Sequence, residues 1–514
     1  MAVTLTINGN STPAAAGETL FDCAARIGVH IPTSCQKQGK CKECMVEITE
    51  GMGLISPPTE HERHLKGNFR LSCRCVLAAD AGQVRCHTMR RGHMRIERSG
   101  QSFLPAGFAS GRAGYGIAMD LGTTTVVLRL FNLATGELAA EASFENPQRF
   151  GGSDVMSRID FDTRHPGKLL RRTLAGYLSH AIQEFPVDPQ LINEMVVVGN
   201  STMRDLFFRQ SVYSIGQSPY RSITEIEMAE GKRWTTSLTE TGRRCLLPIH
   251  PQAHVYGAPI ISGHVGADAA ACMLAMDLAH EDRLVAIMDI GTNTELIVGN
   301  KHRILAASCP AGPAFEGGAI ACGMPALDGA IEDVAIAADG RFEIRVIGDV
   351  PPQGICGSGL VALTGELLRT GRMNEMGRFE DGLRRINLGE DVYFEESDLN
   401  ELAQAKGANA AGLQVVLANY GVSFDDIDVF YLAGGFGRHM KLEAARSIGL
   451  IPNIASSKIV QVGNAAIEGA SIALLSPARR AELEELVGRV EHCRLETHPQ
   501  FFDFFVEGCQ FKPI

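Results

Sequence analysis

The chain contains one short phrase twice, "AMDLGTTTVVLRLFN" at residues 118–132 and "IMDIGTNTELIVGN" at residues 287–300. Each copy runs from apolar residues through Asp, an apolar residue, Gly, Thr, a variable residue and Thr, and then becomes apolar again. An apolar run that stops at a glycine-containing turn and then resumes is typical of two strands joined by a tight turn. The repeat therefore predicts two β-meanders that open corresponding halves of a duplicated body.

The segments that follow each phrase support an α/β class for this body. In the first half, residues 168–185 place apolar side chains on one helical face, and residues 195–200 form a strand pattern. In the second half, residues 358–371 and 398–421 are predicted helices, and "DVFYLAGGFG" at residues 428–437 is a strand that ends in glycines. We expect a first half at residues 114–275 and a second half at residues 276–514.

The repeated turn has the chemistry of a phosphate site. Gly122 and Gly291 let the backbone turn tightly and approach a phosphate without a Cβ atom in the way. Turn N–H groups and Thr hydroxyls can donate to phosphate oxygens, and Asp120 and Asp289 can hold Mg²⁺ or its waters. Two such turns facing each other would hold a β,γ-phosphate pair from both sides. The sequence has neither a Walker A motif nor a Rossmann glycine fingerprint in the right context.

The two phrases resemble the phosphate motifs of the actin/Hsp70/sugar-kinase superfamily, and "YLAGGFG" resembles its adenosine motif. The resemblance implies ATP with Mg²⁺ as the ligand and a duplicated actin-like fold. It implies that Asp289 organises Mg²⁺ and water as the catalytic carboxylate; the alternative is a purely structural turn Asp. The first phosphate turn implied by the resemblance consists of Asp120, Gly122, Thr123 and Thr124. The second consists of Gly291, Thr292 and Asn293, and Gly434 and Gly435 are implied to contact the adenosine.

Half of the 14 cysteines lie in the first 86 residues, which indicates a metal site there. Cys35, Cys41 and Cys44 form C-x5-C-x2-C, and Cys73 follows after 28 further residues. Three thiolates on one loop with a distant fourth is the arrangement that wraps a [2Fe–2S] cluster. Zinc is the alternative, but its second short knuckle is missing because Cys73-x-Cys75 is too tight. Cys75 stays an alternative to Cys73 as a ligand, whereas Cys23 and Cys86 are expected in the core.

The segment around these cysteines is predicted to be a small strand-rich domain at residues 1–88. It resembles a [2Fe–2S] ferredoxin domain, an α+β β-grasp fold, with a spacing nearer to adrenodoxin-like proteins than to plant ones. Such clusters carry one electron, and plant-type clusters have potentials of roughly −400 mV. Residues 89–113 are basic and rich in Gly and Ser, so we expect a linker. Docking of its arginines on an acidic partner is the alternative role.

The composition restricts the function classes. The 514 residues are 45% hydrophobic and carry a net charge of −11, which argues against a general nucleic-acid or anionic-membrane binder. The N-terminal residues lack a signal-peptide pattern, and no apolar run approaches the length of a membrane span. We expect a cytoplasmic protein.

A ferredoxin joined to an ATPase suggests that an electron is moved to an acceptor of lower potential. Each 59 mV of deficit costs about 1.4 kcal/mol for one electron, so a few hundred millivolts are within reach of ATP coupled to a conformational change. From about Thr19 to Glu468 the chain resembles the reductive activators of corrinoid enzymes. The likeness includes "ENPQRFGGSDVMSRI", "VVVGNSTM", "SGHVGADAAACMLA", "ASCPAGPAFEGGAIACGM", "ICGSGL" and "GNAAIEGA".

That resemblance implies ATP-dependent reduction of a Co(II) corrinoid protein to Co(I), which reactivates a corrinoid-dependent methyltransferase. No corrinoid-binding Asp-x-His-x-x-Gly is present, so the corrinoid belongs to a partner protein. An upstream low-potential electron donor is implied, and a homodimer is a possible assembly. The loop Ser308–Ile320 is expected to line a partner-facing cleft with Glu316 as a polar contact, or else to be an internal packing loop. The alternative functions are an activator of a radical dehydratase and a redox-sensing kinase.

Overall fold

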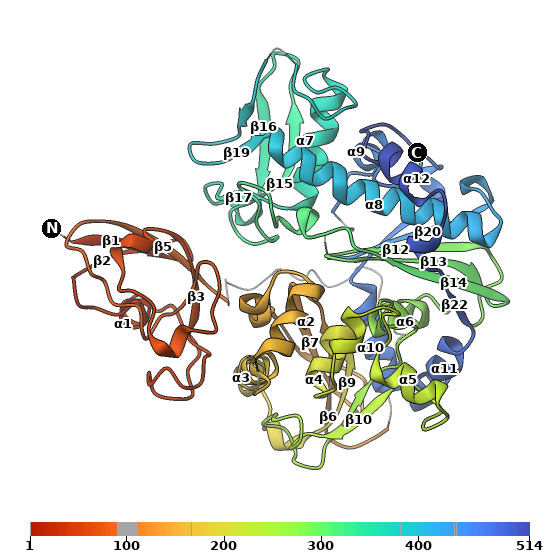
Figure 1. Ribbon diagram of the computed structural model, residues 1–514, viewed down its shortest axis with the longest axis horizontal. Coiled ribbons are helices and arrows are strands. Elements are labelled where there is room, and N and C mark those ends of the chain that lie inside the picture. Colours follow the sequence, from red (N-terminus) through yellow and green to blue (C-terminus); the bar gives the residue numbers. More distant parts are fainter. Residues whose placement is uncertain (1, 90–110, 166, 381, 436, 438) are drawn as a thin grey trace.

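The computed structural model describes residues 2–89, 111–165, 167–380, 382–435, 437 and 439–514. Figure 1 shows an N-terminal domain beside a larger body with two sheets, one in each half. Most of the linker predicted at residues 89–113 lies outside the described residues. Among those that are described, no helix combines the length and the apolar character needed to cross a membrane.

The N-terminal domain is a five-stranded sheet with the order β2-β1-β5-β3-β4. β1 and β5 pair in parallel, and the other neighbours pair antiparallel. The helix α1 (Leu20–Arg26) begins at Thr19, whose side chain accepts the N–H of Asp22, and it buries Leu20 and Cys23. This sheet confirms the predicted β-grasp class. Its strands are β1 (Val3–Ile7), β2 (Asn10–Ala14), β3 (Met45–Glu50), β4 (Phe69–Leu71) and β5 (Gly82–Thr88).

Each half of the body contains a six-stranded sheet, with the orders β10-β11-β9-β6-β7-β8 and β21-β20-β12-β13-β14-β22. In both halves an antiparallel meander of three strands is followed by two parallel partners. The predicted duplication is therefore confirmed. The first sheet consists of β6 (Tyr115–Leu121), β7 (Thr125–Asn132), β8 (Leu138–Glu145), β9 (Ile192–Val198), β10 (Leu238–Thr241) and β11 (His254–Gly257); the second of β12 (Val285–Ile290), β13 (Thr294–Asn300), β14 (Arg303–Cys309), β20 (Val429–Ala433), β21 (Ile459–Gly463) and β22 (Val490–His492).

Two small-residue helices, α6 (Ala267–Ala275) and α10 (Ala465–Leu475), pack against each other between the two sheets. A Cβ atom on Gly469 would lie 2.0 Å from the carbonyl oxygen of Ala271, so only glycine permits this approach. α10 covers β6 and β9 of the first sheet although it comes late in the chain. The boundary at residues 275 and 276 stays a prediction.

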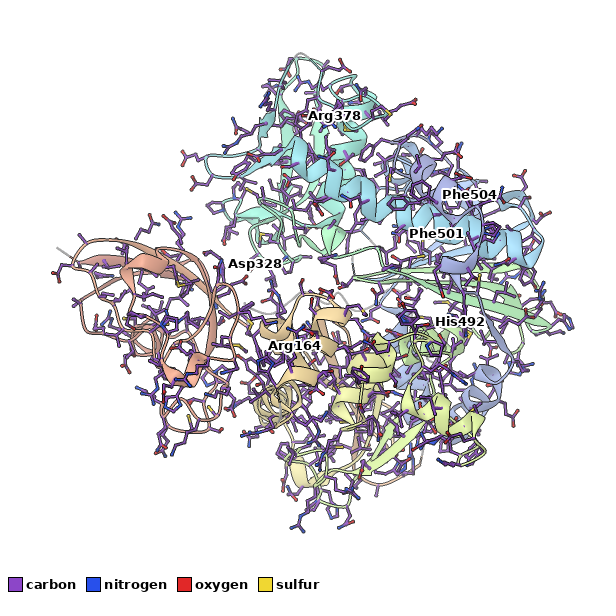
Figure 2. All side chains as sticks on the ribbon, viewed as in Figure 1. Arg164, Asp328, Arg378, His492, Phe501 and Phe504 are labelled. Atoms are coloured by element: carbon purple, nitrogen blue, oxygen red, sulfur yellow. The ribbon has the colours of Figure 1, made fainter. Side chains whose placement is uncertain are left out.

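Further helices cover the outer surfaces. In the first half these include α2 (Val155–Arg164), α3 (Leu169–Gln183), α4 (Ser201–Phe207) and α5 (Ile223–Ala229). In the second half α7 (Gly357–Arg369) and the long α8 (Glu396–Tyr420) confirm the predicted helices. Phe501 and Phe504 of α12 (Phe501–Gly508) pack on the core of the second half (Figure 2). The remaining elements are α9 (Leu442–Ser447), α11 (Pro477–Val487) and two small sheets, β15 (Ala330–Ile336), β16 (Phe342–Val346) and β17 (Gly354–Ile355), and β18 (Arg385–Asn387) with β19 (Tyr393–Glu395).

Candidate nucleotide site and cluster site

A cavity of about 620 Å³ lies between the two halves and is lined by both repeated turns. The turns face each other, since the Oγ1 atoms of Thr124 and Thr292 are 3.0 Å apart. All the residues predicted for the nucleotide site line this cavity. They are Asp120, Gly122, Thr123, Thr124, Asp289, Gly291, Thr292, Asn293, Gly434 and Gly435.

A close backbone contact requires glycine in the first turn and favours it in the second. The N–H of Gly122 donates to the carbonyl oxygen of Thr125 at 3.0 Å, and a Cβ atom on Gly122 would lie 2.7 Å from the same oxygen. In the second turn the N–H of Gly291 donates to the carbonyl oxygen of Asn293 at 3.1 Å, and a Cβ atom on Gly291 would lie 3.3 Å from that oxygen. Both turns line the cavity with Thr side chains, which can donate to phosphate oxygens.

The end of β20 provides an open wall of the cavity. Gly434 has a φ of +109°, and a Cβ atom there would lie 2.3 Å from the carbonyl oxygen of Ile290. A Cβ atom on Gly435 would meet no atom within 4 Å. Gly434 thus permits the close approach of β20 and β12, and Gly435 leaves space in the cavity where a flat group such as a nucleobase fits.

The first turn is held from behind by three polar side chains of its own half. The Asn146 amide donates to the carbonyl oxygen of Gly122 at 2.8 Å, and the fully buried Arg158 donates to that of Thr123 at 2.6 Å. Asn200, which caps α4, donates to the hydroxyl of Thr123 at 2.9 Å. These three bonds fix the backbone and one hydroxyl of the first turn.

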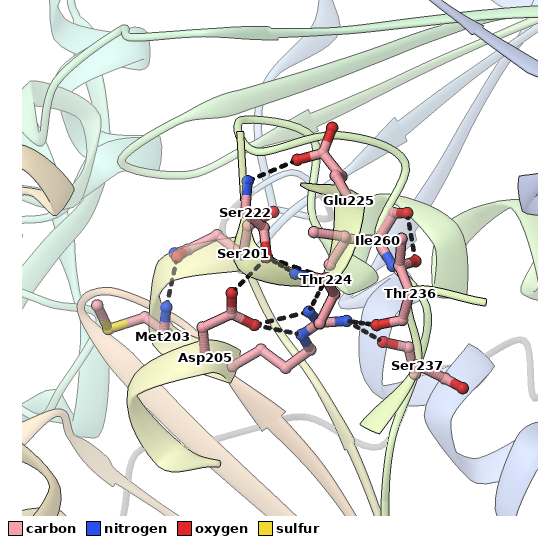
Figure 3. A network of polar contacts seen from close by, with 12 residues as sticks. Ser201, Met203, Asp205, Ser222, Thr224, Glu225, Thr236, Ser237 and Ile260 are labelled. Atoms are coloured by element: carbon pink, nitrogen blue, oxygen red, sulfur yellow. Dashed lines mark hydrogen bonds and ion pairs between the residues drawn. The ribbon is translucent and has the colours of Figure 1, made fainter. Parts of the chain in front are cut away.

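The helix α4 is itself held by a buried network around the ion pair of Arg204 and Asp205 (Figure 3). Both side chains are fully buried and lie 2.6 Å apart. Arg204 also donates to the carbonyl oxygen of Thr236 at 2.8 Å, and Asp205 accepts from Ser222 at 2.7 Å. A buried charge is tolerated when its partners are complete, so this network supports the cap at Asn200.

Buried carboxylates gather beside the two turns. Burial raises the pKa of Asp120 to about 7 and that of Asp289 to about 6. Asp268, at the start of α6, has its pKa raised to about 7 by burial and by the charges of Asp120 and Asp289. Burial also raises the pKa of Glu295 well above its usual value, with the charges of Asp268 and Asp289 adding to this shift. A divalent cation bound here would relieve this repulsion.

Each of the two helices between the halves contacts the turn carboxylate of the opposite half. Asn464, which caps α10, donates to Asp120 at 2.8 Å, and the Cys272 thiol of α6 donates to Asp289 at 3.4 Å. Asp268 and Asn464 were missed from the sequence, although a second repeat, "VGADAAA" at 265–271 and "VGNAAIE" at 462–468, marks both. Asn200 and Glu295 were also missed, and their contacts have no comparable signal.

Glu316 lines the cavity between the two halves, and the alternatives of a partner-facing and an internal role for its loop stay open. Its carboxylate accepts hydrogen bonds from the hydroxyls of Thr124, at 3.0 Å, and Thr292. Burial raises its pKa, and the two hydroxyls oppose that shift. Its position depends on the local backbone: Gly317 has a φ of +82° and ends a short 3-10 turn that directs Glu316 inward. Glu316 therefore bridges the two phosphate turns.

The cysteine loop in the N-terminal domain brings its thiols towards backbone donors. The Sγ atoms of Cys44 and Cys73 are 3.2 Å apart. Burial opposes ionisation of Cys35, but N–H groups of Cys41, Lys40 and Gln38 donate to its sulfur and lower its pKa to about 7. The pKa of Cys73 is also lowered, mainly because the thiol of Cys44 donates to its sulfur. The N–H of Gly39 lowers this pKa further, and burial opposes both contributions. A loop with inward N–H groups fits a cluster whose ligands are thiolates.

The spacing of the sulfur atoms favours two irons over one zinc. A tetrahedral Zn²⁺ with Zn–S bonds of about 2.3 Å would bring all four sulfurs close together. In the part of the chain that the structure describes, the one group of three or more ligand atoms within 4.8 Å of one another is Asp277, His280 and Glu482. No three of the four cysteines meet that limit. In the group of Asp277, His280 and Glu482, both carboxylates already form ion pairs with Arg479.

Burial does not separate Cys75 from the predicted ligands. Cys75 and Cys44 are both fully buried, and the pKa of both thiols is raised, that of Cys75 by burial and that of Cys44 by its hydrogen bond to Cys73 and by burial. Cys73 differs from Cys75 in one contact, since its Sγ atom lies 3.2 Å from that of Cys44. Cys23 and Cys86 are buried in the same core, as expected. The set of Cys35, Cys41, Cys44 and Cys73 stays a prediction.

Comparison with known proteins agrees with this architecture. Three family models match successive parts of the chain: a 2Fe-2S iron-sulfur cluster binding domain at residues 4–78, the RACo middle region at 115–281, and the C-terminal domain of RACo, the ASKHA domain, at 283–513. The N-terminal domain is thus of a [2Fe–2S] cluster-binding type.

Two relatives span most of the chain. The corrinoid activation enzyme RamQ of Eubacterium limosum is 30% identical over 462 residues, which cover 84% of this chain and 75% of the relative. The [Co(II) methylated amine-specific corrinoid protein] reductase of Methanosarcina barkeri is 26% identical over 419 residues, or 76% of each chain. A solved structure, the reductive activator for corrinoid, iron-sulfur protein, is 25% identical with a TM-score of 0.71 over 99% of this chain and 98% of its own. The chain belongs to the family of corrinoid activation enzymes with an N-terminal [2Fe–2S] domain and an ASKHA body.

Proposed function

We propose that the protein uses ATP to drive one electron from its [2Fe–2S] domain to a Co(II) corrinoid protein, giving Co(I) and reactivating a corrinoid-dependent methyltransferase. The observation that carries this proposal is the joint presence of a cysteine loop suited to a [2Fe–2S] cluster and a cavity bounded by two facing phosphate turns. An upstream low-potential donor, a cytoplasmic location and a homodimer belong to the same proposal.

The cavity residues divide the work of holding MgATP. Gly122, Thr123 and Thr124 hold the phosphates from one side, and Gly291, Thr292 and Asn293 from the other. Gly434 and Gly435 lie against the adenosine. Asp289 holds Mg²⁺ or its water and orients the water that attacks the γ-phosphate. Asp120 lies beside it, and its carboxylate is fixed by the amide of Asn464.

The redox step is a one-electron transfer. Cys35, Cys41, Cys44 and Cys73 would hold the cluster, which would supply one electron for each Co(II) of the partner reduced to Co(I), and an upstream donor would replace that electron. Hydrolysis of ATP to ADP and phosphate supplies the free energy, because each 59 mV of unfavourable potential costs about 1.4 kcal/mol.

The decisive experiment mixes the cluster-loaded protein, reduced with Ti(III), with a Co(II) corrinoid protein and follows the Co(I) absorption band with and without MgATP. We expect Co(I) only with ATP. Cys41→Ser should lose the cluster absorbance and retain nucleotide binding. Asp289→Ala should retain the absorbance and lose ATP-dependent reduction. The absence of ATP-dependent Co(I) with corrinoid proteins from several methyltransferase systems would refute the proposal.

A further inference from the structure

The [2Fe–2S] domain is seated on the first half of the body through the loop that carries its cysteines. Glu43, which precedes Cys44, is buried against α3 (Leu169–Gln183). The Tyr177 hydroxyl donates to the backbone oxygen of Glu43 at 2.7 Å, and a His180 ring nitrogen lies 3.3 Å from its carboxylate. Ser34, on the same loop, donates to Glu43 at 2.6 Å. The contact therefore holds the cluster loop itself.

A second set of contacts joins the domain to residues between β8 and α3. Arg149 lies 3.5 Å from the carboxylate of Glu47 and above the ring of Phe69. His64 meets the ring of Phe150 edge-on, with centroids 5.7 Å apart. Opposite charges and an apolar core that continues across the contact make this a specific surface. We call the surface formed by Pro147–Gly151, α2 and α3 the seat.

The seat is bonded directly to the first phosphate turn. Asn146 caps the 3-10 turn Pro147–Gly151, and its own N–H donates to the carbonyl oxygen of Thr124 at 2.7 Å while its amide holds Gly122. Arg158 of α2 holds Thr123. Asn146 is three residues from Arg149, which contacts the [2Fe–2S] domain. A shift of the turn therefore moves groups that form the seat.

The seated position also covers one side of the cluster loop. Glu43 is 6% exposed and Cys44 is fully buried, so the corrinoid of a partner protein is kept away from this side while the domain is seated. Cys35 and Cys41 are partly exposed with the domain seated, and leaving the seat opens the covered side of the loop to a partner as well. A ligand favours a state only through a difference in affinity for the two states.

We propose that seating of the [2Fe–2S] domain and binding of nucleotide phosphate at the first turn oppose each other, with Asn146 and Arg158 as the positioning residues that link them. This rests on the proposed function, in which ATP occupies the first turn. The linkage is reciprocal, so a variant that unseats the domain must bind nucleotide more tightly by the factor by which nucleotide favours unseating.

Two variants weaken the seat at residues that do not line the cavity. Gly176→Leu acts on α3, where a Cβ atom alone would lie 2.8 Å from the Glu43 side chain. Glu47→Lys places a like charge opposite Arg149. Arg172→Leu is the matched control, because Arg172 lies on the same helix and is exposed with the domain seated. Cluster absorbance confirms that each full-length variant is folded and loaded.

Two measurements are then made on each protein. Hydrogen exchange in peptides from α3 reports seating, and titration calorimetry with a non-hydrolysable ATP analogue and Mg²⁺ reports affinity. We expect both seat variants to exchange faster on α3 and to bind the analogue at least about fivefold more tightly. The control should match the native protein in both measurements. Saturating analogue should also raise α3 exchange in the native protein.

An affinity that changes by less than twofold, or that weakens, in an unseated variant overturns the proposal. Protection of α3 that persists in both variants overturns it as well, because a seat that does not open cannot respond to nucleotide. These results are independent of Co(I) formation. A native protein that reduces Co(II) with ATP but shows no linkage refutes this proposal and leaves the proposed function intact.

Discussion

The two phosphate turns have nearly the same sequence but different surroundings. The first turn is bonded through its carbonyl oxygens to Asn146 and Arg158 of the seat, and Asp120 is fixed by the amide of Asn464. In the second turn the carbonyl oxygen of Thr292 accepts from the backbone N–H of Gly312 at 2.9 Å, and Asp289 accepts a weak bond from the thiol of Cys272.

This difference indicates a division of roles. An amide that donates to Asp120 fixes the orientation of that carboxylate and occupies one of its oxygens. A thiol is a weak donor, so the carboxylate of Asp289 stays available for a cation or a water. The duplicated phrase supplies two similar turns, and the different contacts of Asp120 and Asp289 lead us to predict that the first turn is a support and the second the reactive side.

The largest expected effect concerns the support of the first turn. Asp205→Ala leaves the buried Arg204 without its charge partner, and breaking a buried ion pair costs about 3–5 kcal/mol. We expect the free energy of unfolding to fall by that amount in urea denaturation. Asp339→Ala removes a similar neighbour pair, with Arg341, at an exposed site and should change stability by less than about 0.5 kcal/mol. Equal losses in the two variants would mean that the buried network does not support the turn.

The next largest effect is expected on the rate of ATP-dependent reduction when Asp120 or Asp289 is replaced. Asp289→Asn should lower ATP-dependent reduction by at least about 100-fold, as expected for loss of a group that stabilises the transition state. Asp120→Asn should cost less, roughly tenfold, because the oxygen of the new amide can still accept the hydrogen bond from Asn464. Steady-state rates with the same corrinoid partner test this order. A greater loss for Asp120→Asn would reverse the assigned roles.

The pH dependence of stability distinguishes the same carboxylates without any partner protein. The pKa of Asp120 is about 7 in the folded protein and near 4 when unfolded, so the folded state binds more protons between these values. Stability of the nucleotide-free protein should therefore fall as pH rises from about 4 to 7. Asp289, with a pKa of about 6, should contribute over a narrower window.

The measurement is the unfolding free energy at several pH values. Asp120→Asn should flatten the pH profile more than Asp289→Asn does, and saturating Mg²⁺ with a nucleotide should reduce the slope in the native protein. A native profile that is flat over this range would show that the carboxylates are not stabilised in their neutral form.

The smallest expected effect is a change in nucleotide affinity on replacing Glu316, which contacts both turns. Glu316→Gln keeps one oxygen for the hydroxyls of Thr124 and Thr292 but removes a negative charge from the phosphate site. We expect nucleotide affinity to rise by about two- to fivefold, since an exposed or half-buried charge contributes up to about 1 kcal/mol. Titration calorimetry measures this. Weaker binding would show that Glu316 holds the cation and does not repel the phosphates.

The sequence predicted most of the fold because the deciding signals are local. Each copy of the repeated phrase and the apolar helix face at residues 168–185 lie within about twenty residues, and the cysteine pattern lies within about forty. The ten predicted residues of the nucleotide site were found for the same reason. Asp268 and Asn464, which also line the cavity, were missed because their role depends on two helices that cross between the halves. The sequence left two roles open for the loop of Glu316, because the inward direction of that loop depends on Gly317.

The position of α10 has a consequence for how the chain is made. Its apolar side chains cover β6 and β9, and Asn464 meets Asp120 across 344 residues of sequence. At a synthesis rate of about 5–20 residues per second, this interval lasts roughly 20–70 s. During that time the first sheet has one face uncovered on the ribosome. A truncated chain that ends before residue 465 should therefore aggregate or bind chaperones, and the first half should not mature before the second has emerged.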